Sequence, residues 1–299
     1  MLAEEMKFTE GRNLKTVHID AMTSFEIVQL MNEEDKMVPL AVESQLENIA
    51  QLADMAVSSL KTGGRLIYIG AGTSGRLGVL DAAECVPTFG VSPDLVVGLI
   101  AGGEKAMLVA IEGAEDSKEL GEMDLINKNL TKNDLVIGLA ASGRTPYVIG
   151  GLAYARKIGA KTGAISCNKH ASISDYADVA IEVIVGPEVL TGSTRLKSGT
   201  AQKLVLNMIS TSAMIRIGKV YQNLMVDVQP TNQKLVDRAQ RIIMEATGVD
   251  AKTAKSMYEK SDKHPKTAIV MILGEVDKVQ ALEALNKVDG VIRLALKEL

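Results

Sequence analysis

The chain of 299 residues is long enough to bury one large core, and its length allows one large domain together with a small one. Hydrophobic residues make up 46% and charged residues 23%, which is typical of a globular protein and argues against disorder or a fibrous repeat. The net charge of −4 provides no basic field for polyanions, so the composition disfavours nucleic acid as a partner.

Signals for targeting, membrane insertion and metal binding are missing from the sequence. The first 20 residues mix charge throughout and no run of 18 apolar residues occurs, so we expect a cytoplasmic protein without a membrane span. Cys85 and Cys167 form no CxxC motif, which predicts two small buried side chains rather than a disulfide or a zinc site. No two of the three histidines have metal-ligand spacing. The sequence therefore predicts a protein without a metal.

The predicted elements alternate between helix and strand. Apolar residues at helical spacing from Val38 to Leu60 predict a long helix, which ends at Thr62-Gly63-Gly64. Aliphatic runs predict five strands, at residues 65–69, 95–100, 134–140, 162–166 and 179–185. Helical periods separate these strands, at residues 76–85, 104–110, 116–129 and 146–158. This alternation predicts an α/β fold with a doubly wound parallel sheet.

The last third of the chain has a helical pattern. Residues 201–217 predict one long helix, and the residues after Lys234 carry no strand signal apart from the apolar run at residues 268–273. We therefore expect one domain at residues 1–232, with an N-terminal helical extension, and a small helical, UBA-like domain at residues 233–299.

A glycine-rich loop, Gly70–Gly75, follows the first predicted strand and fits the GxGxxG pattern, so a dinucleotide site is considered first. That site needs a carboxylate at the end of the second strand, about 20 residues further on, to bind the ribose. The second strand ends instead in Leu99–Gly102. The hydroxyls of Thr73 and Ser74, with free N–H groups at a helix N-terminus, suit a phosphate monoester better. The alternative is a tight glycine turn with a Thr or Ser cap.

A second hydroxyl-bearing loop, Ser142-Gly143-Arg144-Thr145, follows the third predicted strand, and Pro146 stands at the first turn of the next helix. Ligands of doubly wound sheets bind outside the carboxyl ends of the strands. We therefore expect both loops to converge on one phosphosugar. Arg144 either pairs with the phosphate or caps a surface, and the sequence leaves both roles open.

The two loops together resemble the sugar isomerase (SIS) fold, a flavodoxin-like three-layer sandwich. The segment Gly186–Thr200 resembles the signature shared by N-acetylmuramic acid 6-phosphate etherases and the glucokinase regulatory protein. The segment Thr9–Asn13 resembles the opening of the etherases, and Asp81–Phe89 and Glu112–Asp116 resemble their active-site segments. The resemblance therefore runs from near residue 9 to the carboxyl terminus.

The resemblance to the etherases implies cleavage of the D-lactyl ether of a phosphosugar, which releases D-lactate during amino-sugar catabolism and cell-wall recycling. Elimination followed by addition of water needs two carboxyl groups in opposite protonation states and no cofactor. By family analogy, Glu84 is the acid and Glu115 is the base. Without the resemblance, Glu84 reads as a solvated helix residue and Glu115 as an acid in a first helical turn. The apolar residues around Glu84 predict that a cleft holds it.

The same resemblance implies the substrate-binding residues Gly72, Thr73, Ser74, Ser142, Arg144, Thr145, Lys197 and Ser198. Of these, Ser74, Ser142 and Thr145 are expected to bind the phosphate. For Lys197 and Ser198, contact with the ligand and a role in the dimer both remain open.

Two other functions remain as alternatives, a sugar-phosphate-sensing regulator and an aldose–ketose phosphosugar isomerase. A transcriptional regulator is disfavoured because the first 60 residues contain no basic recognition helix. The glucokinase regulatory protein carries two SIS modules in a much longer chain. The single module here predicts a homodimer in which the partner subunit completes the site.

Overall fold

The computed structural model describes residues 8–228 and 233–299. The chain divides into two compact units, Met1–Ala83 with Asp94–Ser210, and Glu84–Pro93 with Thr211–Leu299. The predicted boundary between residues 232 and 233 touches the segment 229–232, which lies outside the described residues, so that boundary stays a prediction.

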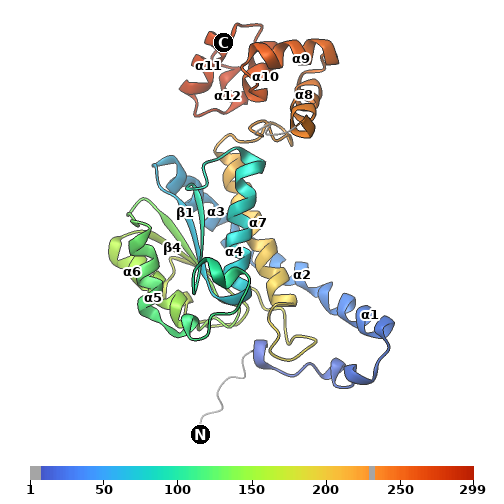
Figure 1. Ribbon diagram of the computed structural model, residues 1–299, viewed down its shortest axis with the longest axis vertical. Coiled ribbons are helices and arrows are strands. Elements are labelled where there is room, and N and C mark those ends of the chain that lie inside the picture. Colours follow the sequence, from blue (N-terminus) through green and yellow to red (C-terminus); the bar gives the residue numbers. More distant parts are fainter. Residues whose placement is uncertain (1–7, 229–232) are drawn as a thin grey trace. The chain divides into compact units, whose positions relative to one another are not determined.

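A parallel sheet of five strands is the centre of the first unit (Figure 1). Its strands are β1 (Leu66–Gly70), β2 (Val96–Ile100), β3 (Leu135–Leu139), β4 (Lys161–Ser166) and β5 (Val179–Glu182). The spatial order is β2-β1-β3-β4-β5, so the direction of winding reverses between β1 and β3. All residues of β1 and β3 are buried, which explains their continuous aliphatic sequences. The predicted doubly wound parallel sheet is confirmed.

Helices cover both faces of this sheet. The helices before, between and directly after the strands are α1 (Ser24–Asp35), α2 (Met37–Glu43), α3 (Leu46–Lys61), α4 (Gly72–Phe89), α5 (Lys118–Asn127), α6 (Pro146–Ile158) and α7 (Lys197–Arg216). Figure 1 shows α5 and α6 on one side of the sheet and α3, α4 and α7 on the other. Two strand glycines let the helices approach closely, because a Cβ at Gly138 would overlap Leu152 of α6 and one at Gly163 would overlap Leu52 of α3. The three-layer sandwich is confirmed.

Two predicted helices differ from the structure. The long helix at residues 38–60 is broken into α2 and α3 at Ser44 and Gln45, where the Ser44 hydroxyl bonds to the Ala41 carbonyl. The helix predicted at residues 104–110 is only the short 3₁₀ turn η4 (Glu104–Met107). Residues 108–111 are exposed, so no apolar face is buried there to stabilise a longer helix.

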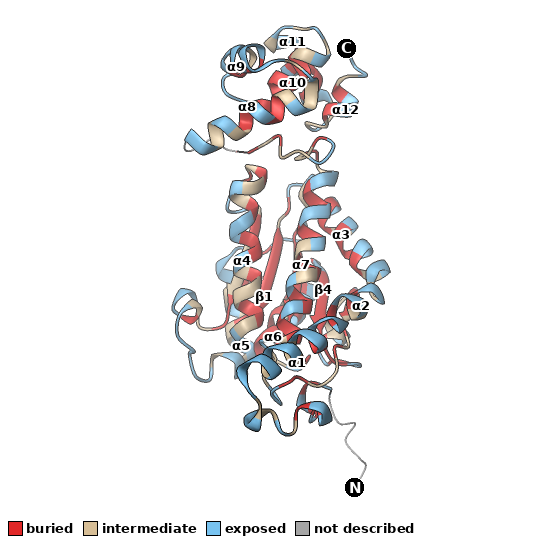
Figure 2. Ribbon diagram, turned by 90° about the vertical axis from the view of Figure 1, so that its right-hand side faces the viewer, coloured by how far each residue is buried: buried red, intermediate tan, exposed pale blue. Residues whose placement is uncertain are grey.

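The second unit contains α8 (Gln233–Thr247), α9 (Ala251–Lys260), α10 (Pro265–Leu273), α11 (Lys278–Lys287) and α12 (Ile292–Ala295). The other four helices pack around α10, whose residues 267–271 are buried (Figure 2). The apolar run at residues 268–273 is therefore a helix despite its strand-like signal, and the predicted helical character of this region is confirmed. A short apolar run has the same pattern in a buried strand and in a buried helix.

Two further predictions concern the burial of the cysteines and the absence of a membrane-spanning helix. Cys85 and Cys167 are both buried, as predicted. Within residues 8–228 and 233–299, no helix combines the length and the apolar character that crossing a bilayer requires.

Candidate active site

The loops after β1 and β3 leave the sheet at the point where its winding reverses. β1 pairs with β3 in register, and the last residues of the two strands, Gly70 and Leu139, are opposite each other. In doubly wound sheets, the crevice at this position is where ligands bind. The sheet topology thus brings both hydroxyl-bearing loops to one edge.

The loop after β1 is tight and leads directly into α4. A Cβ at Gly70 would lie 2.8 Å from the nitrogen of Gly75, and Gly72 has a φ of +52°. Both positions therefore favour glycine. Thr73 is partly exposed, whereas Ser74 is buried and its hydroxyl donates to Oε1 of Gln202 at 2.9 Å. Gln202 is a contact of the predicted site that the sequence did not indicate.

The loop after β3 leads into α6, whose first position is Pro146, as predicted. Thr145 is the N-cap residue, and its side chain makes no capping hydrogen bond, while the N–H of Val148 donates to the Thr145 carbonyl at 3.1 Å. Ser142 is partly exposed beside it, and Gly143 has a φ of +72°.

Asn168, which follows β4, is hydrogen-bonded to this loop and stabilises it. Its Nδ2 donates to the Ser142 carbonyl at 3.2 Å and to Oγ1 of Thr9 at 2.8 Å, and its Oδ1 accepts from the Thr9 N–H. Asn168 is buried and is a residue that the sequence analysis missed. Its partner Thr9 lies 159 positions away, and no local pattern signals such a contact.

Arg144 forms an ion pair with Glu10, with 3.5 Å between Nη2 and Oε1. Both side chains are about half exposed, at 53% and 51%, and pairs of this kind contribute little to stability. The structure therefore places Arg144 at the surface beside the loop, and its contact with a phosphate stays a prediction.

A cavity of about 150 Å³ lies beside the loop after β1. It is lined by Ala71, Gly72, Arg76, Ala101, Ala106, Ala110, Ile111, Glu112, Gly113 and Glu115. Two of the predicted site residues, Gly72 and Glu115, thus share one cavity. Glu115 is exposed and lies in the 3₁₀ turn η5 (Ala114–Asp116), ahead of α5 rather than in its first turn.

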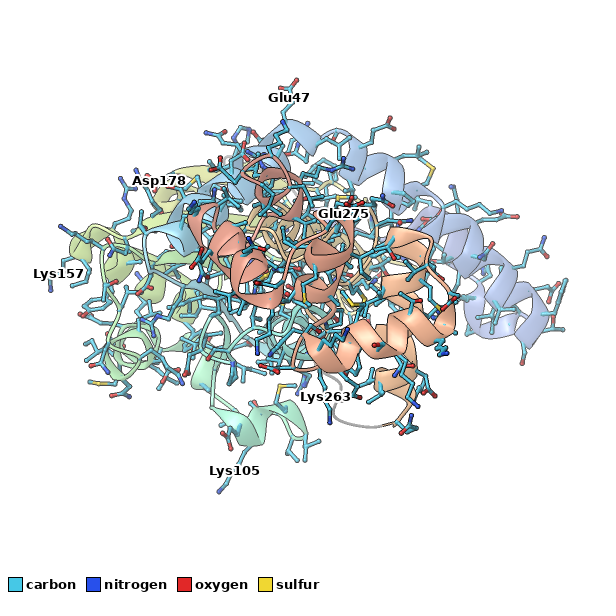
Figure 3. All side chains as sticks on the ribbon, turned by 90° about the horizontal axis from the view of Figure 1, so that it is seen from above. Glu47, Lys105, Lys157, Asp178, Lys263 and Glu275 are labelled. Atoms are coloured by element: carbon cyan, nitrogen blue, oxygen red, sulfur yellow. The ribbon has the colours of Figure 1, made fainter. Side chains whose placement is uncertain are left out.

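Arg76 binds the segment after β2, residues 101–111, which lines one side of this cavity. Its Nε donates to the Met107 carbonyl at 3.0 Å, which ties the segment after β2 to α4. Figure 3 shows Lys105 at the outer end of this segment, with its side chain pointing away from the sheet.

Glu84 is on α4, ten residues beyond Ser74 and about 15 Å further along the helix axis. Its side chain is exposed, whereas the apolar residues around it had predicted a cleft. The chain by itself therefore does not enclose Glu84, and its role as the acid stays a prediction.

Lys197 and Ser198 are buried and are engaged within the chain. Their backbone N–H groups donate to the Glu188 carboxylate at 2.9 Å each, as does the Ser198 hydroxyl, so Glu188 caps the start of α7. The Lys197 ammonium pairs with Glu34 at 2.8 Å, and Lys15 pairs with the other oxygen of Glu34 at 2.9 Å. These contacts give Lys197 and Ser198 a structural role, and their contact with a ligand stays a prediction.

Burial by itself raises the pKa of the Glu34 carboxyl, but the hydrogen bonds and charges of Lys197 and Lys15 outweigh burial and lower that pKa to about 2. Lys197 also lines a larger cavity, of about 690 Å³, between the N-terminal extension and residues 184–187. That cavity contains neither Glu115 nor the loop after β1. Lys197 therefore does not line the cavity of Gly72 and Glu115.

Comparisons with known proteins agree with this architecture. Residues 48–156 match the glucokinase regulatory protein N-terminal SIS domain, and residues 114–212 match the SIS domain. The fold resembles the phosphoheptose isomerase of Francisella tularensis, with a TM-score of 0.51 and 15% identity over 65% of this chain and 100% of that chain. It also resembles the phosphoheptose isomerase of Neisseria gonorrhoeae, with a TM-score of 0.50 and 18% identity over 64% and 98%.

Curated relatives match nearly the whole sequence. The N-acetylmuramic acid 6-phosphate etherase of Exiguobacterium sp. strain AT1b is 62% identical over 288 residues, which are 96% of this chain and 98% of that protein. The etherase of Geobacillus sp. strain WCH70 is 62% identical over 289 residues, or 97% and 98% of the two chains. With this similarity along both chains, the protein belongs to the N-acetylmuramic acid 6-phosphate etherase family.

Proposed function

We propose that this chain is a carbon–oxygen lyase that acts in the cytoplasm on N-acetylmuramic acid 6-phosphate. It cleaves the D-lactyl ether at C3 of the sugar and gives N-acetylglucosamine 6-phosphate and D-lactate. The observation that supports this most is the 62% identity to curated etherases, because it extends over nearly the whole of both chains.

The chemistry follows from the difficulty of displacing an ether oxygen directly. Opening the sugar ring exposes the C1 aldehyde, which acidifies the proton on C2. A base removes this proton, and an acid protonates the lactyl oxygen as the C3–O bond breaks. Water then adds to C3 of the unsaturated aldehyde. Every step is a proton transfer or an addition that side-chain carboxyl groups can catalyse.

Glu115 is proposed as the base at C2. It lines the cavity that also contains Gly72, beside the loop proposed to hold the sugar phosphate. Glu84 is proposed as the acid for the lactyl oxygen. Because Glu84 lies about 15 Å along α4 from Ser74, beyond the reach of a sugar whose phosphate is bound at Ser74, this role requires that Glu84 act in the site of the partner subunit of the proposed dimer.

The phosphate is proposed to bind between the N-termini of α4 and α6, where Ser74, Ser142 and Thr145 provide hydroxyl groups. The phosphate lies far from the bond that breaks, so its binding energy serves to position the reacting carbons. Gly72, Thr73 and Arg144 are proposed to line the same end of the site.

We also propose that the active form is a homodimer. The helices α1 and α2 expose large apolar side chains, including Phe25 at 74%, Val28 at 58% and Leu40 at 56%. Glu84 and Glu115 are both exposed in the single chain, which supports a site that a second subunit completes. A monomeric mass by light scattering at micromolar concentration contradicts this proposal.

The decisive experiment incubates the purified protein with N-acetylmuramic acid 6-phosphate and measures D-lactate. The match to the glucokinase regulatory protein domain keeps a sugar-phosphate sensor as the second candidate. A sensor binds the sugar phosphate without releasing lactate, and an isomerase interconverts aldose and ketose without releasing it. Binding without D-lactate therefore contradicts the proposed reaction.

A further inference from the structure

Two polar contacts join α4 and α7 in the interior of the first unit. One is built on Asp81, which accepts hydrogen bonds from Tyr68 at 2.9 Å, Asn207 at 2.7 Å and Ser210 at 3.1 Å. With three donors, this buried carboxylate is well satisfied. It fixes how α7 lies against α4, two helical turns beyond Ser74.

The other contact joins Ser74 to Gln202, and it is incomplete. The Ser74 hydroxyl donates to Oε1 of Gln202. Gln202 is buried, with 1% of its surface exposed. Within the described part of the chain, Nε2 of Gln202 is buried and has no hydrogen-bond partner. A buried donor without an acceptor is unfavourable and needs an explanation.

The direction of this hydrogen bond matters for the proposed ligand. A serine hydroxyl has one proton to donate, and a phosphate monoester dianion can only accept. While the Ser74 proton points to Gln202, the hydroxyl offers only lone pairs to a phosphate. Ser74 therefore cannot donate to the phosphate in this arrangement.

Half a turn of the Gln202 amide exchanges its oxygen and its nitrogen. Nε2 then donates to the Ser74 oxygen, so the buried donor gains a partner and the serine proton is released, while Oε1 gives up that proton and takes the former place of Nε2. In one orientation of the Gln202 amide, the Ser74 hydroxyl donates its proton to Gln202. In the other orientation, it can donate its proton to a phosphate.

We propose that Gln202 is the positioning residue of the phosphate site, because its amide orientation sets whether the Ser74 hydroxyl donates to the phosphate of the substrate. This inference rests on the proposed role of Ser74. Gln202 acts through Ser74 and does not itself contact the substrate.

The test compares Gln202→Glu with Gln202→Met in steady-state assays of D-lactate release, with inorganic phosphate as a competing ligand. An ionised glutamate has two acceptors and no donor, so it keeps the Ser74 proton withheld. We expect the KM and the inhibition constant of phosphate to rise about tenfold or more, while kcat changes less than about threefold. Methionine has a similar shape but has neither the donor nor a strong acceptor, so the Ser74 hydroxyl loses its orientation without being held away from the phosphate, and the KM should rise less than in Gln202→Glu. The exposed Gln51 of α3, changed to Glu, is the matched control.

The Ser74→Ala background separates the possible causes. If Gln202→Glu acts through the hydroxyl, it has no further effect on KM once that hydroxyl is gone. A full effect that persists in this background reflects charge repulsion and overturns the inference. Equal losses in Gln202→Glu and Gln202→Met also overturn it, since they indicate packing damage.

The proposed role of Ser74 fails separately from the inference. If Ser74→Ala leaves both the KM and the phosphate inhibition constant unchanged, the phosphate assignment of Ser74 is wrong. If Ser74→Ala weakens binding while Gln202→Glu does not, only the inference about Gln202 is overturned. Thermal unfolding of each variant confirms that the proteins compared are folded.

Discussion

The segment Gly186–Thr200 and the cavity beside β1 both contain polar residues of the family motifs, but these residues differ in their burial. In the segment, Glu188, Lys197 and Ser198 are buried and hydrogen-bonded within the chain. At the cavity, Glu115 is exposed and remains available to a ligand. Polar residues whose partners are all internal stabilise the fold, whereas those left exposed at the edge of the sheet are available for chemistry.

The substitution Glu115→Gln tests most directly whether the exposed residues at the cavity take part in the reaction. The amide keeps the shape of the site but cannot accept the C2 proton, so both ether cleavage and solvent-deuterium exchange at C2 should fall by about 10²–10⁴-fold. Because Glu115 is exposed, thermal stability should be unchanged. Proton NMR in deuterated buffer follows the C2 signal and lactate together, and Asp116→Asn in the same turn is the control. Losses below tenfold remove Glu115 from the catalytic residues.

Glu84→Gln is expected to fail in a different way. Without the acid, the lactyl oxygen is not protonated, so lactate release should fall by about 10²–10⁴-fold while some exchange at C2 persists. The same NMR experiment measures both. Exchange that survives in Glu115→Gln and disappears in Glu84→Gln reverses the two assignments.

The substitution Glu34→Gln tests whether the buried contacts of Lys197 stabilise the fold. The substitution leaves the Lys197 ammonium buried without its anionic partner, and breaking a buried pair in this way costs about 3–5 kcal/mol of unfolding free energy. Urea denaturation followed by circular dichroism measures the loss, with the exposed neighbour Glu33→Gln as the control. A change under 1 kcal/mol shows that the Lys197 contacts do not stabilise the fold.

The dependence of stability on acid pH also tests the structural role of Glu34, with a smaller expected effect. The folded chain lowers the pKa of Glu34 from 4.5 to about 2, so the contribution of this carboxylate is fully present above pH 4.5. It is lost as the pH falls from 4.5 towards 2. The difference in unfolding free energy between the wild type and Glu34→Gln should therefore shrink over that range. A constant difference contradicts the role of the ionised carboxylate.

Much of the sheet was predictable, because its signals are local. Each strand is an aliphatic run, and the turn after β1 needs glycine at Gly70 and Gly72 for reasons of space and of positive φ. Prediction failed where packing decided the outcome. Residues 104–110 form only a short 3₁₀ turn, because residues 108–111 are exposed and bury no apolar face. The run at residues 268–273 has a strand-like signal but lies in the helical region that was predicted, as a helix surrounded by others.

The sequence by itself determined the order of strands and helices and the two loops with hydroxyl groups, since these depend on neighbouring residues. Only the tertiary structure decided which polar residues face one another. Lys197 meets Glu34 across 163 positions, and Ser74 meets Gln202 across 128. Such partners are chosen by the packing of helices on the sheet, which depends on shape and burial along the whole chain. Lys197 therefore became part of the core, while Glu115 was left exposed at a cavity.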